Sequence, residues 1–200
     1  AEVKRSPKQN IGGWVSGGDI KYLDQPDVNG NYDNVIDSND RQYTGMPTTP
    51  EIVYGFGPSF RYKKFDFSFF FQGAARVSIM MNGIHPFGDG ETRSVLQFIA
   101  DDYWSEDNQN IYAKYPRLSK RDNPNNTAWS TYWQRNGAFL KLKNAEIGFN
   151  HKFFRIYLRG SNLLTFSPFK YWDPEMGSGS GLSYPTQRVF NVGVQFSINK

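Results

Sequence analysis

Five segments of the chain alternate apolar and polar residues. Residues two apart along a strand point to the same face of a sheet, so this period predicts β-strands with one apolar face. The five segments are residues 53–62, 65–73, 138–150, 154–164 and 190–198. Aromatic residues and glycine are abundant and long helical patterns are few, so the chain predicts an all-β fold of strands joined by turns.

The clearest of these strands is the segment 65–73. One face holds only phenylalanine: Phe65, Phe67, Phe69 and Phe71. The other face holds Asp66, Ser68 and Gln72. Two other segments are less regular. Pro58 interrupts the segment 53–62, because proline cannot donate to a sheet ladder. The alternation in 138–150 falters near Asn144, which predicts a β-bulge.

The connections between these strands alternate between short and long. Lys63-Lys64 joins the first two strands, and a few residues around His151-Lys152 join the third and fourth. The other two connections have about sixty and about twenty-five residues. In an antiparallel meander, this order places every short turn at one end and every long loop at the other. Outer-membrane barrels have that asymmetry, whereas a soluble sandwich has no reason for it.

The long connections contain two further patterns. Residues 92–104 place Val95, Phe98, Ile99 and Tyr103 at helical spacing, which predicts a short amphipathic helix. Residues 177–181 read Gly-Ser-Gly-Ser-Gly and predict a flexible loop tip, without the spacing of a phosphate-binding loop. Residues 1–52 are polar and rich in turn residues, with no convincing strand.

Composition excludes several classes of protein. The chain has 200 residues, a formal net charge of +4 and no cysteine, which rules out disulfides and thiolate metal sites. Its longest basic run is Lys63-Lys64, so we expect no nucleic-acid partner. It contains no G-x-S-x-G, H-E-x-x-H or Walker A motif, and no pair of carboxylates stands out. The sequence therefore favours a role other than that of an enzyme.

An Asx-rich segment at residues 29–40 is spaced like a twelve-residue calcium loop. Oxygen donors at positions 1, 3, 5, 7, 9 and 12 would come from Asn29, Asn31, Asp33, the carbonyl of Val35, Asp37 and Asp40. The loop departs from the usual pattern at three positions: position 1 is Asn29 rather than aspartate, position 6 is Asn34 rather than glycine, and position 12 is Asp40 rather than glutamate. The alternative is a surface turn held by its own side-chain hydrogen bonds.

Two groups of side chains could serve binding or packing. Five basic residues lie on the polar strand faces and could line a lumen and pair with acidic groups there, or simply be solvated: Arg61, Lys141, Lys143, Arg155 and Arg159. Nine aromatic residues in or beside the long loops could stack on ligands, pack the loops or lie at a membrane interface: Trp104, Tyr112, Tyr115, Trp129, Tyr132, Trp133, Tyr171, Trp172 and Tyr184.

A series of short motifs runs along the chain from Gly18 onward. They are G-D-I-K-Y at 18–22, I-D-S-N-D-R at 36–41, Y-G-F at 54–56, F-D-F-S-F-F-F-Q-G at 65–73, Y-P-R-L at 115–118, G-A-F-L-K-L-K-N at 137–144, N-L-L-T-F at 162–166 and Y-W-D-P-E at 171–175. Their order and spacing resemble the C-terminal portion of the SusC/RagA family of TonB-dependent outer-membrane transporters. The segment 29–40 departs from the family's loop and is preceded by an additional Asp27-Val28.

The last strand carries a pattern of its own. Asn191, Gly193, Phe196 and Ile198 resemble the polar-x-Gly-x-x-aromatic-x-apolar signal that the barrel assembly machinery reads. A strand at a sheet edge suits that role, because its free N–H and C=O groups can pair with a partner. Asn199-Lys200 follow the last apolar position, where many such proteins end on the aromatic residue.

The resemblance implies a large transmembrane β-barrel of the 22-stranded class with a plugged lumen, in the bacterial outer membrane. About five strands cannot close such a barrel, so we expect a fragment whose plug and TonB-coupling region lie upstream. Residues 1–52 would form an extracellular loop region with the calcium-like turn, and residues 53–200 the barrel strands and loops. Phe60, Tyr62, Phe65 and Phe67 would contact lipid near the periplasmic interface.

The implied function is energised import of oligosaccharides or peptides, with a SusD-like surface lipoprotein as the lid over the barrel. Two alternatives stay open. One is a barrel that has lost transport and acts as a scaffold in a surface complex. The other is a soluble, calcium-stabilised β-sandwich that binds glycans, in which Phe67, Phe69, Ile156 and Val194 would pack into a closed core instead of facing lipid.

Overall fold

The computed structural model describes residues 3–81, 94–120 and 123–197. The chain forms two compact units, and each is built from two separate parts of the sequence. Unit 1 consists of Ala1–Thr44 and Asn82–Trp133, and unit 2 of Gly45–Met81 and Gln134–Lys200. The long second connection therefore folds with the N-terminal region, which local sequence patterns did not indicate.

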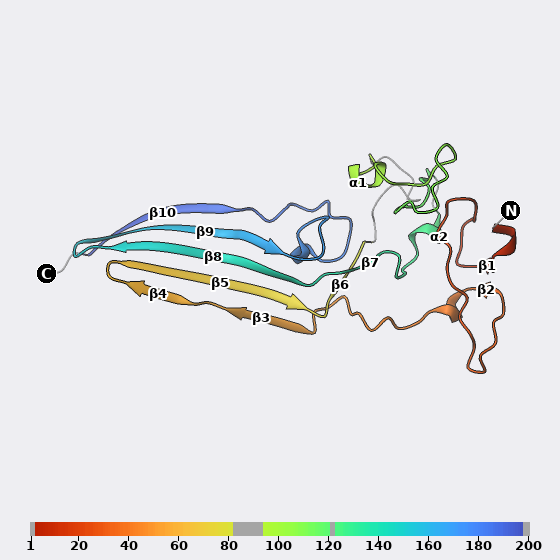
Figure 1. Cartoon of the computed structure of the whole chain (residues 1–200), viewed down its shortest axis with the longest axis horizontal. Coiled ribbons are helices and arrows are strands. Elements are labelled where there is room, and N and C mark those ends of the chain that lie inside the picture. Colours follow the sequence, from red (N-terminus) through yellow and green to blue (C-terminus); the bar gives the residue numbers. More distant parts are fainter. Residues whose placement is uncertain (1–2, 82–93, 121–122, 198–200) are drawn as a thin grey trace. The chain divides into compact units, whose positions relative to one another are not determined.

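Unit 2 contains a six-stranded antiparallel sheet. Its strands are β3 (Ile52–Phe56), β4 (Ser59–Tyr62), β5 (Phe65–Ala75), β8 (Phe139–Asn150), β9 (Phe154–Phe166) and β10 (Val189–Phe196). Their order is β10-β9-β8-β5-β3, with β4 also paired to β5 (Figure 1). All five predicted strands are confirmed. The first is divided into β3 and β4, which lie end to end along β5 on either side of Gly57-Pro58.

The sheet is irregular at the predicted bulge. Phe70 pairs with Asn144 and Phe71 with Leu142, so Lys143 is an additional residue on β8. On the other side of β8, Leu142 pairs with Leu164 and Asn144 with Ser161. Inserting one residue in a strand breaks the period of two, which is why the alternation in the sequence falters at this point.

The register sorts the side chains of the sheet by polarity. One row across β5, β8, β9 and β10 is Phe67, Ile147, Leu158 and Val192. The adjacent row is Ser68, Glu146, Arg159 and Asn191. The apolar row is largely uncovered by described residues: Leu158 is 46% and Val192 75% exposed. Ile156 and Val194 are also exposed, so these side chains are not gathered in a closed core.

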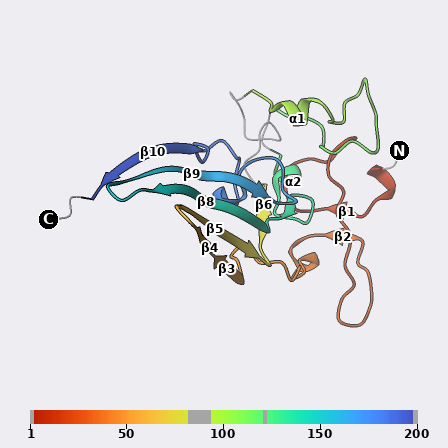
Figure 2. The ribbon, with the colours of Figure 1, turned by 60° about the vertical axis from the view of Figure 1, so that its left-hand side comes forward.

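The short and long connections lie at opposite ends of the sheet, as predicted. The β4–β5 turn at Lys63-Lys64 and the β8–β9 turn are adjacent, since the N–H of Asn150 donates to the carbonyl of Lys64 at 2.7 Å. Both turns lie at the same end of the ribbon in both views, and the connections after β5 and β9 leave the other end (Figures 1 and 2).

A second, smaller sheet belongs to unit 2 and was not predicted. It pairs β6 (Ser78–Met80) with β7 (Gln134–Asn136). The side chains of β6 are buried, together with Val77 and Met81. The Gly-Ser-Gly-Ser-Gly segment returns to this sheet, because the N–H of Met80 donates to Ser178 Oγ and the N–H of Gly179 donates to the carbonyl of Met80, both at 3.0 Å.

Unit 1 contains only short elements. They are η1 (Val3–Arg5), β1 (Lys8–Gln9), β2 (Val35–Ile36), η2 (Ser38–Asp40), α1 (Gln97–Ala100) and α2 (Pro124–Thr127). Strands β1 and β2 are parallel, and a small apolar core holds Ile20, Ile36, Ile99, Tyr115 and Trp133.

The predicted helix over 92–104 is wrong in its extent. Residues 92 and 93 lie outside the described residues, and α1 occupies only Gln97–Ala100. The following residues leave the helical path because the N–H of Trp104 donates to the carbonyl of Tyr115 at 3.0 Å and that of Tyr115 to Asp102 at 3.1 Å. Among the described residues, no helix is long and apolar enough to cross a membrane.

Candidate functional site

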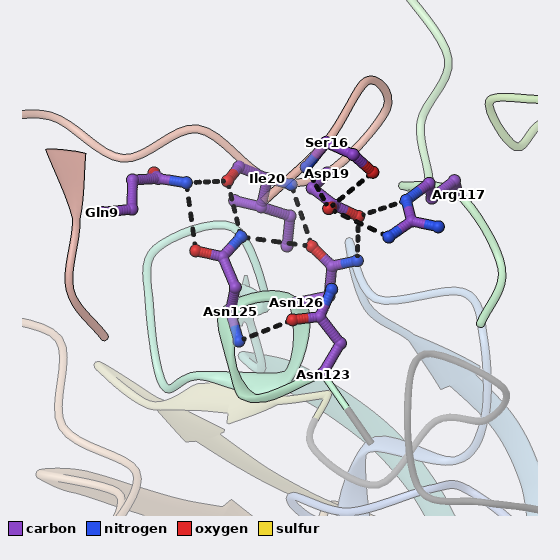
Figure 3. Close-up of polar contacts among 8 residues, drawn as sticks. All are labelled: Gln9, Ser16, Asp19, Ile20, Arg117, Asn123, Asn125 and Asn126. Carbon is purple, nitrogen blue, oxygen red and sulfur yellow. Dashed lines mark hydrogen bonds and ion pairs between the residues drawn. The ribbon is translucent and has the colours of Figure 1, made fainter. Parts of the chain in front are cut away.

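A buried polar cluster in unit 1 is built around Asp19. The side chain of Asp19 is 0% exposed and forms an ion pair with Arg117, whose Nε and Nη2 lie 2.8 and 3.2 Å from its two carboxylate oxygens. It also accepts the N–H of Ser16 at 2.8 Å and Nδ2 of Asn126 at 2.8 Å (Figure 3). These bonds compensate the cost of burying a charge. They also join the G-D-I-K-Y and Y-P-R-L motifs, about a hundred residues apart in the sequence.

Three buried asparagines hold the backbone beside Asp19. Asn123, Asn125 and Asn126 lie in and before α2, and none has exposed surface. The N–H of Ile20 donates to Asn126 Oδ1 at 3.0 Å, and Asn125 Nδ2 donates to the carbonyl of Ile20 at 2.9 Å. The amides thus take the place of a neighbouring strand for Ile20 (Figure 3). Sequence reasoning missed this cluster, because asparagines beside a proline are also typical of exposed turns.

Gly17 and Gly18 lie against the indole of Trp104. Gly18 has φ +82°, and a Cβ on it would come within 2.1 Å of Trp104 Cε3. Only glycine combines this backbone conformation with so close an approach. The Gly18–Trp104 contact and the hydrogen bonds of Asp19 therefore hold Trp104 and the loop that contains Asp19 (the Asp19 loop, residues 16–20) in fixed positions relative to each other.

These fixed residues form part of the wall of a groove in unit 1. The groove has a volume of about 910 Å³, within the range of small-ligand sites. Residues 3–9, 13–21 and 104–116 contribute most of its lining, and Tyr132 completes it. Of the nine loop aromatics, three line this groove: Trp104, Tyr115 and Tyr132.

The remaining loop aromatics divide between packing and exposure. Trp133 is buried and donates its Nε1 to the carbonyl of Asn126 at 2.8 Å. Trp172 donates its Nε1 to the carbonyl of Gly177 at 3.0 Å, and its ring lies 4.7 Å from that of Phe169. Tyr112, Trp129, Tyr171 and Tyr184 are exposed. Trp133 and Trp172 therefore support loop packing, one of the two structural roles expected for this group.

The calcium-like segment is held by its own hydrogen bonds. Asp33 Oδ1 accepts the N–H of Val35, and Asp37 Oδ1 that of Asn39, both at 2.8 Å. Asp40 forms a capping box with Asp37 at the start of η2. Among the described residues, no three acidic or histidine side chains converge into a metal cluster.

The residues expected at positions 1 and 3 of the loop lie in a separate turn. The N–H groups of Asn29 and Asn31 donate to Asp27 Oδ1 at 2.8 and 2.9 Å. These two bonds lower the pKa of the Asp27 carboxyl. The additional Asp27-Val28 thus belongs to a small turn inserted before Asp33.

Asp24 lies where a first ligand of the loop would be expected. Its Oδ2 accepts the N–H of Asn34 at 2.9 Å, and Asn34 has the left-handed φ of 60° expected at the sharp turn of a calcium loop. Its Oδ1 is buried and has no hydrogen-bond partner. Asp40 lies beside it, because Asp40 Oδ1 accepts the N–H of Gln25 at 2.7 Å. The N–H groups of Gln25 and Asp37 lower the pKa of the Asp40 carboxyl.

Arg155 and Arg159 on the polar face of the sheet pair with carboxylates of this same chain, whereas Arg61 forms no ion pair with a described residue. Arg155 Nη2 lies 2.5 Å from Asp66 and 2.7 Å from Glu146. Arg159 lies 3.6 Å from Glu146. The strip predicted from the sequence is therefore a network of alternating charges that crosses β5, β8 and β9.

A second charged group ties the loop after β9 to β8. The Lys141 side chain is 2% exposed, and its Nζ lies 2.5 Å from both Asp173 and Glu175. Lys143 pairs with Glu175 at 3.0 Å. Burial raises the pKa of Asp173, but hydrogen bonds from Lys141 and the N–H of Glu175 outweigh it, and the pKa is lowered. The Y-W-D-P-E motif thus contacts the F-L-K-L-K-N motif directly.

The proposed assembly signal lies on the outermost described strand. Asn191, Gly193 and Phe196 are in β10, and Ile198 lies outside the described residues. A Cβ on Gly193 would come within 2.2 Å of Tyr157 Cζ. A larger residue here would therefore require the Tyr157 ring to shift, and recognition of the signal stays a prediction.

Two curated proteins that are similar in sequence to this chain are both TonB-dependent receptors. No family model matches the chain. TonB-dependent receptor P3 of Formosa agariphila is 29% identical over 191 residues, covering 84% of this chain and 18% of that protein. TonB-dependent receptor P26 of the same organism is 29% identical over 204 residues, covering 88% and 19%. The chain thus spans about a fifth of the length of these curated relatives.

Solved structures share the fold. The RagAB peptide importer in its open-open state matches with a TM-score of 0.63 and 21% identity, covering 88% of this chain and 20% of that one. Its closed-closed state matches with a TM-score of 0.62 and 23% identity, covering 86% and 20%. The sequence motifs, the open antiparallel sheet and these relatives agree: the chain is similar to about a fifth of the length of TonB-dependent receptors, and it shares the fold of the corresponding part of the RagAB importer.

Proposed function

We propose that this chain is the C-terminal barrel segment of an outer-membrane importer. The observation that carries the proposal is the sheet of unit 2, which leaves a wide apolar face uncovered by described residues and pairs its charges on the opposite face. A sheet with a lipid-facing apolar surface and a polar interior is the wall of a transmembrane barrel. A β-sandwich would need a second layer over this apolar face.

The imported ligand and the partners belong to the same proposal. An importer of this kind would take up oligosaccharides or peptides, with unit 1 among the extracellular loops and a SusD-like lipoprotein as its lid. RagAB, which shares the fold, is described as a peptide importer. Energy would reach the barrel from TonB through an upstream plug region, and the barrel assembly machinery would insert the strands.

Uptake by cells that carry the full-length transporter tests this proposal. Deletion of its gene should abolish uptake of a labelled oligosaccharide or peptide mixture, and the protein should fractionate with the outer membrane. Deletion of the gene for the SusD-like lipoprotein should reduce uptake as well. A protein that stays in the aqueous fraction without detergent would contradict the proposal, and membrane insertion without any uptake would favour the scaffold alternative.

We also propose that residues 24–40 bind calcium, with Asp24 in place of Asn29 as the first ligand. The support is the buried Oδ1 of Asp24, which lacks a hydrogen-bond partner and lies beside a second carboxylate. A hard cation beside these two carboxylates would provide a partner for the buried oxygen, and backbone carbonyls such as that of Val35 and water could complete the oxygen shell.

Calorimetric titration of the full-length protein with calcium tests this second proposal. Asp24→Asn should weaken binding strongly, because it removes one charge from the pair. Asn29→Ala is the matched control and should leave affinity unchanged, since the N–H of Asn29 donates to Asp27 whatever its side chain. Absence of calcium binding by the unaltered protein, or equal loss in both variants, would overturn it.

A further inference from the structure

Three lysines surround the groove in unit 1. Lys4, Lys8 and Lys21 line it and are exposed, and none forms an ion pair with a described residue. Lys21 belongs to the G-D-I-K-Y motif, directly after the buried Asp19 and Ile20. Three cations around one groove produce a local positive potential that attracts anionic groups.

Among the described residues, no free carboxylate offsets this charge inside the groove. Asp19 is the only acidic residue that the described part of the chain contributes to its lining. The side chain of Asp19 is buried and paired with Arg117, so its charge is already compensated. The groove is therefore cationic, in contrast to the polar face of the sheet, where Arg155 and Lys141 are paired with carboxylates.

The rest of the lining suits a sugar ring better than a peptide. Trp104 and Tyr132 provide aromatic surface, and Gln109 and Asn110 provide amides for hydroxyl groups. A peptide is often bound by a free strand edge, and the described strand nearest the groove is β1, which has only two residues. The Gly18–Trp104 contact and the Asp19 cluster hold much of the groove in place before a ligand arrives, which lowers the cost of binding.

We propose that this groove binds an acidic oligosaccharide, with Lys8 and Lys21 contacting its sulfate or carboxylate groups and Trp104 its ring faces. The inference rests on the proposed import function and narrows its substrate class. It concerns unit 1 alone, so the groove can fail to bind such a ligand while the protein still transports another.

Binding measurements on the full-length transporter with its lipoprotein partner test the proposal. The probes are a sulfated or uronate-rich oligosaccharide, a neutral oligosaccharide of the same length, and an acidic peptide of the same charge. The acidic oligosaccharide should bind most tightly, and its affinity should fall as salt is raised. Lys8→Gln and Lys21→Gln should each weaken its binding about two- to fivefold, as expected for exposed ion pairs.

Lys120→Gln is the matched control, because Lys120 is an exposed lysine of unit 1 that does not line the groove. It should leave binding unchanged. Equal affinity for the neutral sugar, preference for the acidic peptide, or the same loss in all three lysine variants would overturn the inference. So would a full-length structure in which another segment fills the groove. Uptake of labelled ligand by cells that carry the same variants distinguishes the two proposals. Normal uptake without binding of the acidic oligosaccharide to the groove would contradict the groove proposal alone, whereas absence of uptake by the unaltered protein would contradict the import proposal.

Discussion

Gly18 determines how closely the Asp19 loop can approach Trp104. Its φ of +82° is a conformation that side chains with a Cβ adopt only at a cost, and its position against the indole leaves no room for one. Gly30 has almost the same backbone conformation, φ +85°, with nothing within 4 Å of the position of a Cβ. The two glycines therefore separate backbone strain from steric overlap.

Substitution of Gly18 by alanine should destabilise the protein more than the same change at Gly30. Gly30→Ala adds only the strain of the left-handed backbone, about 1–2 kcal/mol. Gly18→Ala adds the same strain and about 1–3 kcal/mol more for the overlap with Trp104. Denaturant unfolding of the two variants measures the difference. Equal losses of stability would mean that Trp104 moves aside freely.

The Asp19–Arg117 pair should contribute strongly to the stability of unit 1. Asp19→Asn leaves Arg117 without its partner in a largely buried position, which typically costs about 3–5 kcal/mol. Asp102→Asn is the matched control, because Asp102 pairs with Lys114, whose side chain is mostly exposed, and such pairs contribute less than about 1 kcal/mol. Denaturant unfolding should show the contrast. Similar losses of stability in the two variants would mean that the hydrogen bonds of Asp19 in the folded protein are worth no more than the hydrogen bonds that it makes with water in the unfolded chain.

The strands of unit 2 could be predicted because one physical property, the period of two, determines them. The same pattern located the break at Pro58 and the bulge at Lys143. The helix over 92–104 was overestimated because, beyond α1, the backbone of Asp102 and Trp104 is hydrogen-bonded to that of Tyr115. The cluster around Asp19 was beyond prediction, since it depends on asparagines about a hundred residues away that no local pattern connects to it.

We expect the ordered conformation of the loop after β9 to depend on Lys141. Lys141→Met keeps much of the side-chain volume but leaves Asp173 and Glu175 without their buried cation, so hydrogen exchange at residues 173–179 should accelerate. Lys143→Met is the control and should have a smaller effect, because the Lys143 side chain is more exposed than that of Lys141. Equal protection in the unaltered protein and in Lys141→Met would show that packing of Trp172 alone orders this loop.

The same loop should respond to pH in a predictable direction. The pKa of Asp173 is lowered in the folded protein, so its bonds stabilise the loop above the carboxyl's unfolded pKa. That contribution should be lost as the pH falls through the lower, folded pKa. The protection factors at residues 173–179, which correct for the intrinsic pH dependence of exchange, should therefore fall in acid in the unaltered protein. Lys141→Met should show a weaker pH dependence, and an unchanged dependence would contradict the role of this pair.

Both outer strands of the sheet have edges with no partner among the described residues: β10 on one side, and β3 with β4 on the other. An apolar face without cover and two open edges are unfavourable in water for an isolated sheet. The open edges would be paired if further strands continue the sheet into a closed barrel, and the apolar face would be removed from water if lipid covers it. This arrangement therefore accounts for a regular sheet whose apolar face is left uncovered by the described residues.

Charge placed on the two faces of the sheet provides the sharpest test of this arrangement. Leu158→Arg puts a cation on the apolar face, which should cost about 2–4 kcal/mol if that position lies near the middle of a bilayer. Gln195→Arg puts the same charge on the polar face of the adjacent strand and should cost little. The yield of heat-modifiable, folded barrel in outer-membrane fractions of cells expressing the full-length protein measures both. Equal yields would mean that Leu158 does not face lipid. A low yield for Gln195→Arg alone would mean that the faces are reversed and the apolar side chains point inward.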